Sequence, residues 1–450
     1  MFSRNGEFYR QVNSSYADIF DQFVQSGLYD KLVSKSYLVA HEELGVGEIE
    51  PPEADCHKIL KPAQLAHISY PYEWSFSQLK DAALLTLRIQ ALALRNGFSL
   101  KDASAYNIQF VGSKPIFIDT LSFEPYVDGK PWSAYRQYCQ HFLAPLALIA
   151  YRGPEFSKTL TTFIDGVPLE FASRMLPLRT KFSYGLIAHI HAHARIQGDY
   201  ADSAADGKVQ KAQDAKLSKE SLLALIESLA RITDKLQWKI PQTEWGDYYA
   251  NTNYSDVAAN EKEALVDRFL ADIPGPLEIV QDLGANTGKF SRIASARAAT
   301  VVAQDIDPVA VERHYLAIKS NGPENITPLI QDLFAPSPAI GWANTERDSF
   351  VARSKADVVM ALALIHHLAI SNNAPLENIA RLFASLSKWL IIEFVPKSDS
   401  QVVRLLQTRE DIFPHYNVDG LEKAFSDFYS IKKKEQIAGA DRILYLMERR

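Results

Sequence analysis

The chain has 450 residues, of which 47% are hydrophobic and 23% charged, as in globular proteins of two or three domains. It carries 48 Lys and Arg against 54 Asp and Glu, and the net charge of −6 argues against a nucleic-acid or anionic-membrane partner. Two cysteines, Cys56 and Cys139, are too few for a disulfide framework and favour a reducing, cytoplasmic compartment. The polar first residues predict no signal peptide, and no apolar run is long enough to cross a bilayer.

The first 200 residues predict a mixed α+β domain with more helix than strand. Long apolar stretches with helical spacing alternate there with short strand-like runs, two of which flank a turn at Gly112-Ser113. The expected helices cover 79–94, 140–150 and 184–195, and the expected strands cover 106–110 and 115–118.

Within this domain, Asp102 is followed five residues later by Asn107, and Asp119 comes after a short hairpin. The arrangement resembles the catalytic and metal-binding loops of kinases and small-molecule phosphotransferases. The resemblance implies that Asp102 orients a hydroxyl while Asn107 and Asp119 hold magnesium. The usual His before the first Asp is absent, Thr-Leu follows Asp119 in place of Phe-Gly, and no glycine-rich phosphate loop lies upstream. We expect a degenerate kinase-like lobe that docks an acceptor; an active phosphotransferase and a chance match stay open as alternatives.

Three histidines alternate near the end of this half, at His189, His191 and His193. Their spacing is not that of helical metal ligands, and no carboxylate accompanies them. We therefore predict no metal site.

A linker is expected after residue 198, where Asp, Lys, Ala, Ser and Gln dominate and large apolar residues nearly vanish up to 219. Apolar residues from Leu222 to Leu236 then repeat at helical spacing, with Ser218 as the N-cap. The predicted organisation is an N-terminal domain over 1–200, a linker and helix over 201–240, and a C-terminal domain over 241–450.

The C-terminal domain alternates buried strands with helices, which predicts an α/β, Rossmann-like, doubly wound parallel sheet. A hairpin is expected at the end of the sheet, with a reversed last strand. Strands are expected at 278–283, 300–305, 326–330, 357–362 and 389–394, helices at 308–319, 376–386 and 401–409, and the hairpin at 428–433 and 442–447.

The first of these strands runs into a glycine loop, Asp282-Leu283-Gly284-Ala285-Asn286-Thr287-Gly288, which opens a helix. Two glycines let the backbone turn sharply and approach a ligand, and a helix N-terminus supplies N–H donors. The D-x-G-x-x-x-G spacing is neither a nicotinamide fingerprint nor a Walker A loop. Asp305 follows at the tip of the second strand, where a carboxylate can accept both hydroxyls of a ribose, and Asp332 follows the third strand.

Together these residues resemble a class I S-adenosylmethionine-dependent methyltransferase over about 245–450. The segment 357–368, which ends in His366-His367-Leu368, is similar to the fourth motif of that family. The resemblance implies S-adenosylmethionine as the cofactor, with Asp305 on its ribose and Asp332 at its adenine. The implied cofactor-binding residues are Asp282, Gly284, Ala285, Asn286, Gly288, Asp305, Ile306, Asp332 and Leu333.

The candidate bases are His366 and His367, because ligands bind at the carboxyl edge of such sheets. It stays open whether one or both histidines only brace the loop. Glu393 is a further candidate that could equally pair with a cation. An aromatic segment over 244–249 with Tyr254 is expected to cover the cofactor or to pack the linker, and Trp342 and Arg347 are candidate acceptor contacts.

We therefore expect a methyltransferase that acts on a small-molecule or carbohydrate acceptor. The whole chain also resembles bacterial methyltransferases associated with nodulation proteins, which implies little about the acceptor. Two alternatives stay open: a regulatory protein that binds the cofactor without catalysis, and a phosphotransferase centred on Asp102, Asn107 and Asp119.

Overall fold

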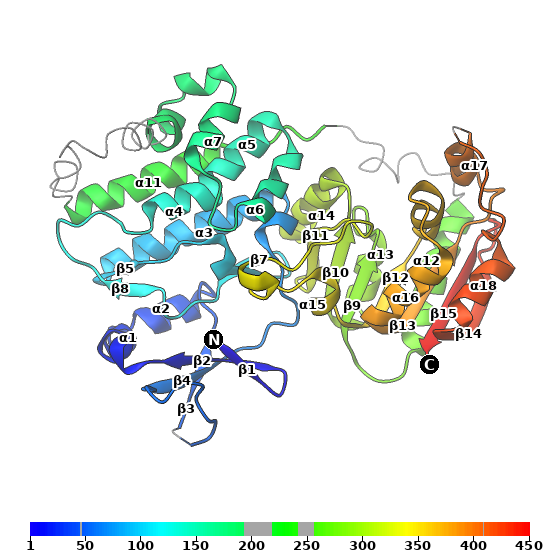
Figure 1. Ribbon diagram of the computed structural model, residues 1–450, viewed down its shortest axis with the longest axis horizontal. Helices are drawn as coiled ribbons and strands as arrows, with labels where there is room; N and C mark the ends of the chain where they lie inside the picture. The colour runs from blue at the N-terminus through cyan, green and yellow to red at the C-terminus, as the bar shows by residue number, and fades with distance from the viewer. Residues whose placement is uncertain (46, 193–217, 242–255, 408) are drawn as a thin grey trace. The chain divides into compact units, whose positions relative to one another are not determined.

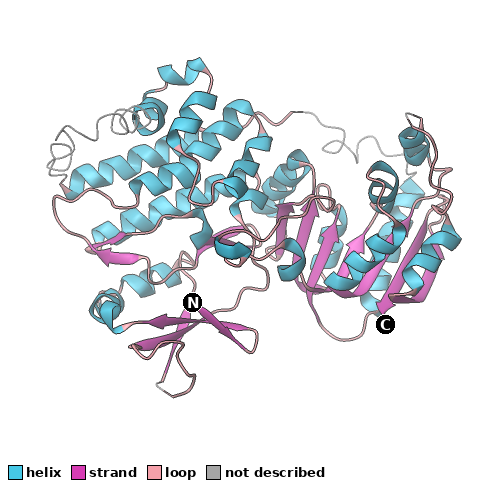
Figure 2. Cartoon of the chain, viewed as in Figure 1, coloured by secondary structure: helices cyan, strands magenta, loops and turns pink. Residues whose placement is uncertain are grey.

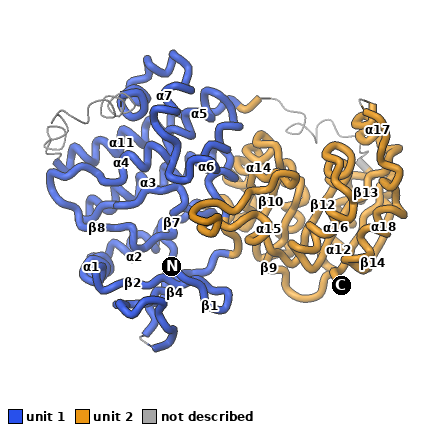
Figure 3. Tube along the Cα trace, in the orientation of Figure 1, with its two compact units in different colours: residues 1–65, 69–110, 115–239 blue, residues 66–68, 111–114, 240–450 orange. Residues whose placement is uncertain are grey.

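The computed structural model describes residues 1–45, 47–192, 218–241, 256–407 and 409–450. The chain divides into two compact units, shown in Figure 3. Unit 1 comprises 1–65, 69–110 and 115–239, and unit 2 comprises 66–68, 111–114 and 240–450. Most of the expected linker and all of the expected aromatic covering segment lie outside the described residues.

Unit 1 begins with a four-stranded antiparallel sheet in the order β1-β2-β4-β3, which the sequence did not predict. Its strands are short and mostly half-exposed, so they lack the apolar runs by which a buried strand is recognised. A small core beneath it joins Val12, Phe20 and Leu60. The elements are β1 (Phe2–Arg4), β2 (Glu7–Val12), α1 (Ala17–Gln25), α2 (Leu28–Ser34), β3 (His41–Leu44) and β4 (Lys58–Pro62).

The rest of unit 1 has more helix than strand (Figure 2), as the sequence predicts. The long buried helix α3 (Phe76–Arg95) begins at Ser75, whose hydroxyl accepts the N–H of Gln78 in a capping box. Helix α11 (Lys219–Lys235) packs along α3, and Ser218 caps it as predicted. The other elements are β5 (Phe98–Leu100), β6 (Ile108–Val111), β7 (Lys114–Phe117), β8 (Phe123–Pro125), α4 (Tyr135–Tyr138), α5 (Ala144–Arg152), α6 (Thr159–Thr162), α7 (Leu169–Met175) and α8 (Tyr184–Leu186).

The strand expected at 106–110 begins two residues late. Ser104 accepts the N–H of Tyr106 and caps a 3₁₀ turn over Ala105–Asn107, so β6 starts at Ile108. It pairs with β7, which confirms the expected pair of short strands. A π-helical turn over Cys139–Leu143 joins α4 to α5, so the helix expected at 140–150 is part of a longer helical run.

Unit 2 contains a seven-stranded sheet in the order β11-β10-β9-β12-β13-β15-β14 (Figure 1). The first five are parallel, and β15 runs antiparallel to both β13 and β14. This confirms the predicted doubly wound α/β fold with a reversed last strand. The strands are β9 (Leu277–Leu283), β10 (Ala298–Asp305), β11 (Ile326–Ile330), β12 (Ala356–Ala361), β13 (Ser387–Phe394), β14 (Tyr429–Gln436) and β15 (Ile443–Arg449).

Two apolar cores cover the two faces of this sheet, because successive side chains of a strand point to opposite sides. Val358 and Met360 of β12 join the core under α12 and α13, whereas Val359 and Ala361 join the core under α16 and α18. Both faces are therefore buried. The helices are α12 (Asp256–Asp272), α13 (Lys289–Ser295), α14 (Pro308–Asn321), α15 (Phe350–Arg353), α16 (Leu376–Leu386), α17 (Ser400–Leu406) and α18 (Val418–Ser426).

Helix α17 is shorter than the expected 401–409. It begins at the cap of Asp399, whose carboxylate accepts the N–H of Gln401, and it ends at Leu406. Arg409 lies beyond it, and its guanidinium donates to the Asn373 side chain at 2.6 Å.

The strand order reverses between β10 and β12, which both flank β9. Crossovers leave in opposite directions from such a point, and a crevice opens at the carboxyl ends of the strands. The sheet thus places the end of β9, with the glycine loop, beside the ends of β10 and β12.

Candidate cofactor and active site

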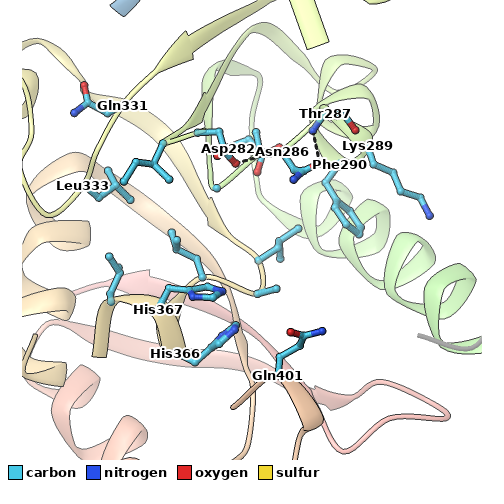
Figure 4. A pocket seen from close by; sticks show the side chains of 18 of the residues that line it. Asp282, Asn286, Thr287, Lys289, Phe290, Gln331, Leu333, His366, His367 and Gln401 are labelled. Carbon is cyan, nitrogen blue, oxygen red and sulfur yellow. Dashed lines mark hydrogen bonds between the residues drawn. The ribbon is translucent and has the colours of Figure 1, made fainter. Parts of the chain in front are cut away.

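A cavity of about 1220 Å³ opens in unit 2 at the carboxyl edge of the sheet (Figure 4). It is large enough for a nucleoside-sized ligand together with part of a second molecule. Among the implied cofactor-binding residues and the two candidate bases, Gly288 is the one that does not line it. The predicted residues that do are Asp282, Gly284, Ala285, Asn286, Asp305, Ile306, Asp332, Leu333, His366 and His367.

The glycine loop is bonded to the neighbouring strand. The N–H groups of Gly284 and Ala285 both donate to the carbonyl of Gln304, at 2.8 and 2.9 Å. Asn286 has φ +51°, a left-handed conformation that Asn tolerates better than most residues. The loop is therefore fixed against β10 and presents its backbone to the cavity.

Gly288 has a packing role. Its φ is +81°, and a Cβ there would lie 2.0 Å from Nε2 of His314. His314 is buried in α14, and burial lowers its pKa to about 3, so it is neutral near pH 7. Only glycine lets the start of α13 lie against this imidazole.

Asp305 joins the tip of β10 to the glycine loop. Its carboxylate accepts the N–H of Asn286 at 2.8 Å and that of Asp307 at 2.9 Å. Burial raises the pKa of Asp305 to about 6, although both backbone bonds favour the ionised form. The residue is almost fully buried yet lines the cavity, so its oxygens are held at fixed positions at the cavity wall.

Asp282, at the end of β9, lies deeper. Its carboxylate accepts the hydroxyl of Ser291 in α13 at 2.6 Å. Burial raises the pKa of Asp282 to about 6, opposed by the Ser291 hydrogen bond and by the Lys262 ammonium. This carboxylate orients the first turn of α13 toward the loop.

A buried charge network that sequence reasoning did not find supports one wall of the cavity. Lys262 of α12 places its ammonium 2.6 Å from Glu393, and both side chains are buried. Arg442 reaches Glu393 at 3.3 Å and Asp399, the cap of α17, at 2.8 Å. Glu393 is thus paired with two cations, one of the two roles considered for it. No sequence motif marks Lys262 or Arg442, because their partners lie more than 40 residues away.

At the third strand, Asp332 forms a turn of its own. Its carboxylate accepts the N–H of Phe334 at 2.8 Å, which directs the chain past the cavity edge. Gln331, which sequence analysis missed, donates its backbone N–H to the Asp305 carbonyl and also lines the cavity. Ile306 and Phe334 are each 58% exposed at the cavity, as apolar surfaces that could cover a flat ring.

His366 and His367 follow β12, and Figure 4 shows their rings together, apart from Asn286 and Thr287 of the loop. The ring centroids are 4.0 Å apart. Burial lowers the pKa of both, that of His367 to about 4 and that of His366 well below its ordinary value, and the Arg442 cation adds to both effects. Both are therefore neutral near pH 7. Among the described residues, no group hydrogen-bonds to His366 Nδ1.

The kinase-like triplet of unit 1 has a different environment. Asp119 forms an ion pair with Arg10 of β2, and it accepts the Ser122 hydroxyl at 2.6 Å and the Leu121 N–H at 3.0 Å. Asp102 accepts the N–H of Ser104 at 2.8 Å. In the described parts of the chain, no group of three or more His, Cys, Asp or Glu residues is arranged to hold a metal ion.

The remaining candidates lie away from the cavity lining. His189 bonds to the Tyr135 hydroxyl at 2.7 Å and His191 to the Ser173 hydroxyl at 2.8 Å, while His193 lies outside the described residues. Trp342 is exposed on a small hairpin closed by the Ile340–Arg347 bridge, and neither Trp342 nor Arg347 lines the cavity.

Comparison with known proteins gives one curated relative of high coverage. The nodulation protein NoeA of Rhizobium meliloti (strain 1021) is 37% identical over 395 residues, which are 87% of this chain and 82% of that protein. This confirms the expected resemblance to nodulation proteins. No protein-family model matches the chain.

Solved structures with similar folds include methyltransferases. The N-methyltransferase NodS from Bradyrhizobium japonicum WM9 is 12% identical, with 43% of this chain and 98% of that chain covered and a TM-score of 0.33. The bifunctional kinase-methyltransferase WbdD is 16% identical, with 47% of this chain and 43% of that chain covered and a TM-score of 0.31.

Proposed function

This chain belongs to the family of the nodulation protein NoeA, and we propose that it is a methyltransferase that uses S-adenosylmethionine. The acceptor we propose is a small molecule or a carbohydrate. Residues 241–450 carry the transfer, and 1–200 form a kinase-like domain that recognises the acceptor. The segment 201–240 lies between them in the sequence, and its helix α11 packs within unit 1. NoeA is named for nodulation, and that name alone does not specify a reaction.

The observation that carries the proposal is the position of Asp305 between the glycine loop and the cavity. A carboxylate whose oxygens are already fixed by two backbone N–H groups can accept ribose hydroxyls without losing its own orientation. Asp332 and Leu333, which follow β11, would line the adenine, and Asn286 with the loop backbone would face the rest of the cofactor. The residues present therefore fit an adenosine-containing cofactor.

The cofactor, when bound, supplies the methyl group, and the chain supplies position and proton acceptance. Methyl transfer is an in-line displacement, so fixing the two reactants in contact contributes much of the rate. A neutral imidazole accepts a proton from an acceptor hydroxyl or amine as the new bond forms. His366 and His367 are both neutral and line the cavity, so we assign one of them this role.

A phosphotransferase is less well supported. Asp119 would have to release Arg10 before it could bind magnesium, because the guanidinium already neutralises the carboxylate. We therefore treat unit 1 as a lobe for recognition.

The test is calorimetric titration of the intact protein with S-adenosylmethionine, repeated on Asp305→Ala and on Asp307→Ala. Asp307 caps α14 through Val309 N–H, so its variant is a matched loss of one carboxylate at the same strand end. We expect at least tenfold weaker binding for Asp305→Ala, about 1.4 kcal/mol, and a smaller change for Asp307→Ala. Absence of both heat and thermal shift with the intact protein would overturn the proposal.

A further inference from the structure

Three large apolar side chains of unit 1 are almost fully exposed within seven residues. Leu178 is 73% exposed, Phe182 is 88% and Tyr184 is 85%. Single exposed apolar residues are ordinary, but leaving a Leu or Phe in water forgoes the favourable free energy of burying it. A cluster of them indicates a surface that contacts something other than water.

Leu178 and Phe182 belong to a short turn that follows α7 in the chain, and Tyr184 begins α8 two residues later; α7 is labelled in Figure 1. The 3₁₀ helix over Leu178–Phe182 buries only Thr180. The Thr180 hydroxyl donates to the Pro177 carbonyl at 2.7 Å and lies 3.0 Å from Nε2 of His191. With that one residue as anchor, the other four positions of the turn point outward.

The same turn is basic. Arg179 and Lys181 are exposed between the apolar residues, and Arg174 is exposed in α7 just before them. Arg152 donates to the Met175 carbonyl at 2.6 Å, which brings a fourth cation to this surface. From residue 171 to residue 192 the chain has no Asp or Glu. In a chain of net charge −6, this is a local concentration of positive charge.

We propose that Leu178, Arg179, Lys181, Phe182 and Tyr184, here called the 178–184 patch, dock the protein onto an anionic lipid surface. Exposed aromatic and aliphatic side chains favour the boundary between headgroups and acyl chains, and each nearby Lys or Arg adds electrostatic attraction to anionic lipid. A protein partner would not account for the absence of acidic residues as directly. The net charge, from which we expected no membrane partner, does not report how charge is distributed over the surface.

Docking would be peripheral. Within the part of the chain that the structure describes, no helix is long and apolar enough to cross a membrane. The inference does not depend on the proposed methyl transfer, because the patch lies in unit 1 and shares no residue with the cavity of unit 2.

The test is co-sedimentation of the full chain with vesicles of phosphatidylcholine containing phosphatidylglycerol, and with vesicles of phosphatidylcholine alone. We expect binding to the first that weakens with salt, and little binding to the second. The double variant Leu178→Ser/Phe182→Ser should lower the partition coefficient about tenfold or more, and Arg179→Glu/Lys181→Glu should do the same. The control is Ile412→Ser/Trp342→Ser, which removes two exposed apolar side chains from unit 2 and should change nothing.

All variants change exposed residues, so unchanged thermal melting will confirm that they fold. No binding of the intact chain to anionic vesicles, or binding that the apolar double variant leaves unaltered, would overturn the proposal. Light scattering during chromatography gives the remaining outcome: a dimer that Leu178→Ser/Phe182→Ser converts to monomer would assign the patch to a second copy of the chain, and would equally overturn it.

Discussion

Two carboxylates that the sequence marks in similar ways have opposite environments. Asp305 lines an open cavity, and its oxygens are oriented by backbone N–H groups rather than by a cation. Asp119, in the kinase-like triplet, is neutralised by Arg10 and held by Ser122 and Leu121. Each follows a strand-like run, so a local motif does not distinguish them.

The difference lies in what each carboxylate can still do. Burial raises the pKa of Asp305 to about 6, and that raised value reflects an unfavourable charge that a ligand donor would stabilise. Asp119 already has its stabilising cation, so a metal or substrate would have to displace it. In the structure, one acidic motif lines a cavity and the other is already paired with a cation.

The buried network behind the cavity should give the largest effect. Lys262→Met leaves Glu393 buried with only Arg442 beside it, so we expect about 3 kcal/mol of lost stability in denaturant unfolding. Lys289→Met, which breaks the half-exposed pair with Glu263, should cost about 1 kcal/mol or less. The double variant Lys262→Met/Glu393→Gln should recover part of the loss. Equal losses of stability in Lys262→Met and Lys289→Met would contradict the expectation that the buried pair contributes more than the half-exposed pair.

The packing of the glycine loop should give the next largest effect. Gly288→Ala places a methyl group against His314, and we expect about 1–3 kcal/mol of destabilisation from overpacking in addition to the strain of φ +81°. Gly275→Ala in the same unit has φ +87° with nothing within 4 Å, so it measures that strain alone. The difference between the unfolding free energies of the two variants in urea gives the cost of the contact with His314. If the two cost the same, His314 does not restrict the loop.

The pH dependence of cofactor binding tests the ionisation of Asp305. Ribose hydroxyls donate to an ionised carboxylate, so affinity for S-adenosylmethionine should fall about tenfold between pH 7 and pH 5 as Asp305 protonates. The stability of the unliganded protein depends on pH in the opposite direction. Because its folded pKa is raised, Asp305 favours folding at pH below about 4, and that contribution is lost as pH rises through about 6. Calorimetric titration with S-adenosylmethionine at several pH values should show that the affinity of the wild-type protein falls toward pH 5. The affinity of Asp305→Ala should change less with pH.

The smallest effect is expected at Asp119. Arg10→Met and Asp119→Ala should each cost about 1 kcal/mol, because the pair is only partly buried. Neither should change affinity for S-adenosylmethionine. In a double-mutant cycle measured by thermal unfolding, the double variant should lose less stability than the sum of the losses in the two single variants. Magnesium-dependent ATP binding that Asp119→Ala abolishes would instead support the phosphotransferase alternative.

Much of unit 2 was predictable because its signals are local. Five buried strands gave continuous apolar runs, and the observed strands begin or end within two residues of the expected ones. The glycine loop and Asp305 follow two of those strands directly, so their meeting at one sheet edge follows from parallel order. The antiparallel sheet of unit 1 was missed because its strands are short and half-exposed.

By itself, the sequence determined the α/β class of unit 2, the strand ends from which the candidate site is built, and the family to which the chain belongs. Only the tertiary structure decided which charges meet. It paired Glu393 with Lys262 and Arg442, neutralised Asp119 with Arg10, and placed His314 under Gly288. Hydrophobic periodicity is encoded over a few neighbouring residues, whereas ion pairs and close contacts join residues that are dozens of positions apart. Their partners become apparent only when the strands and helices are packed.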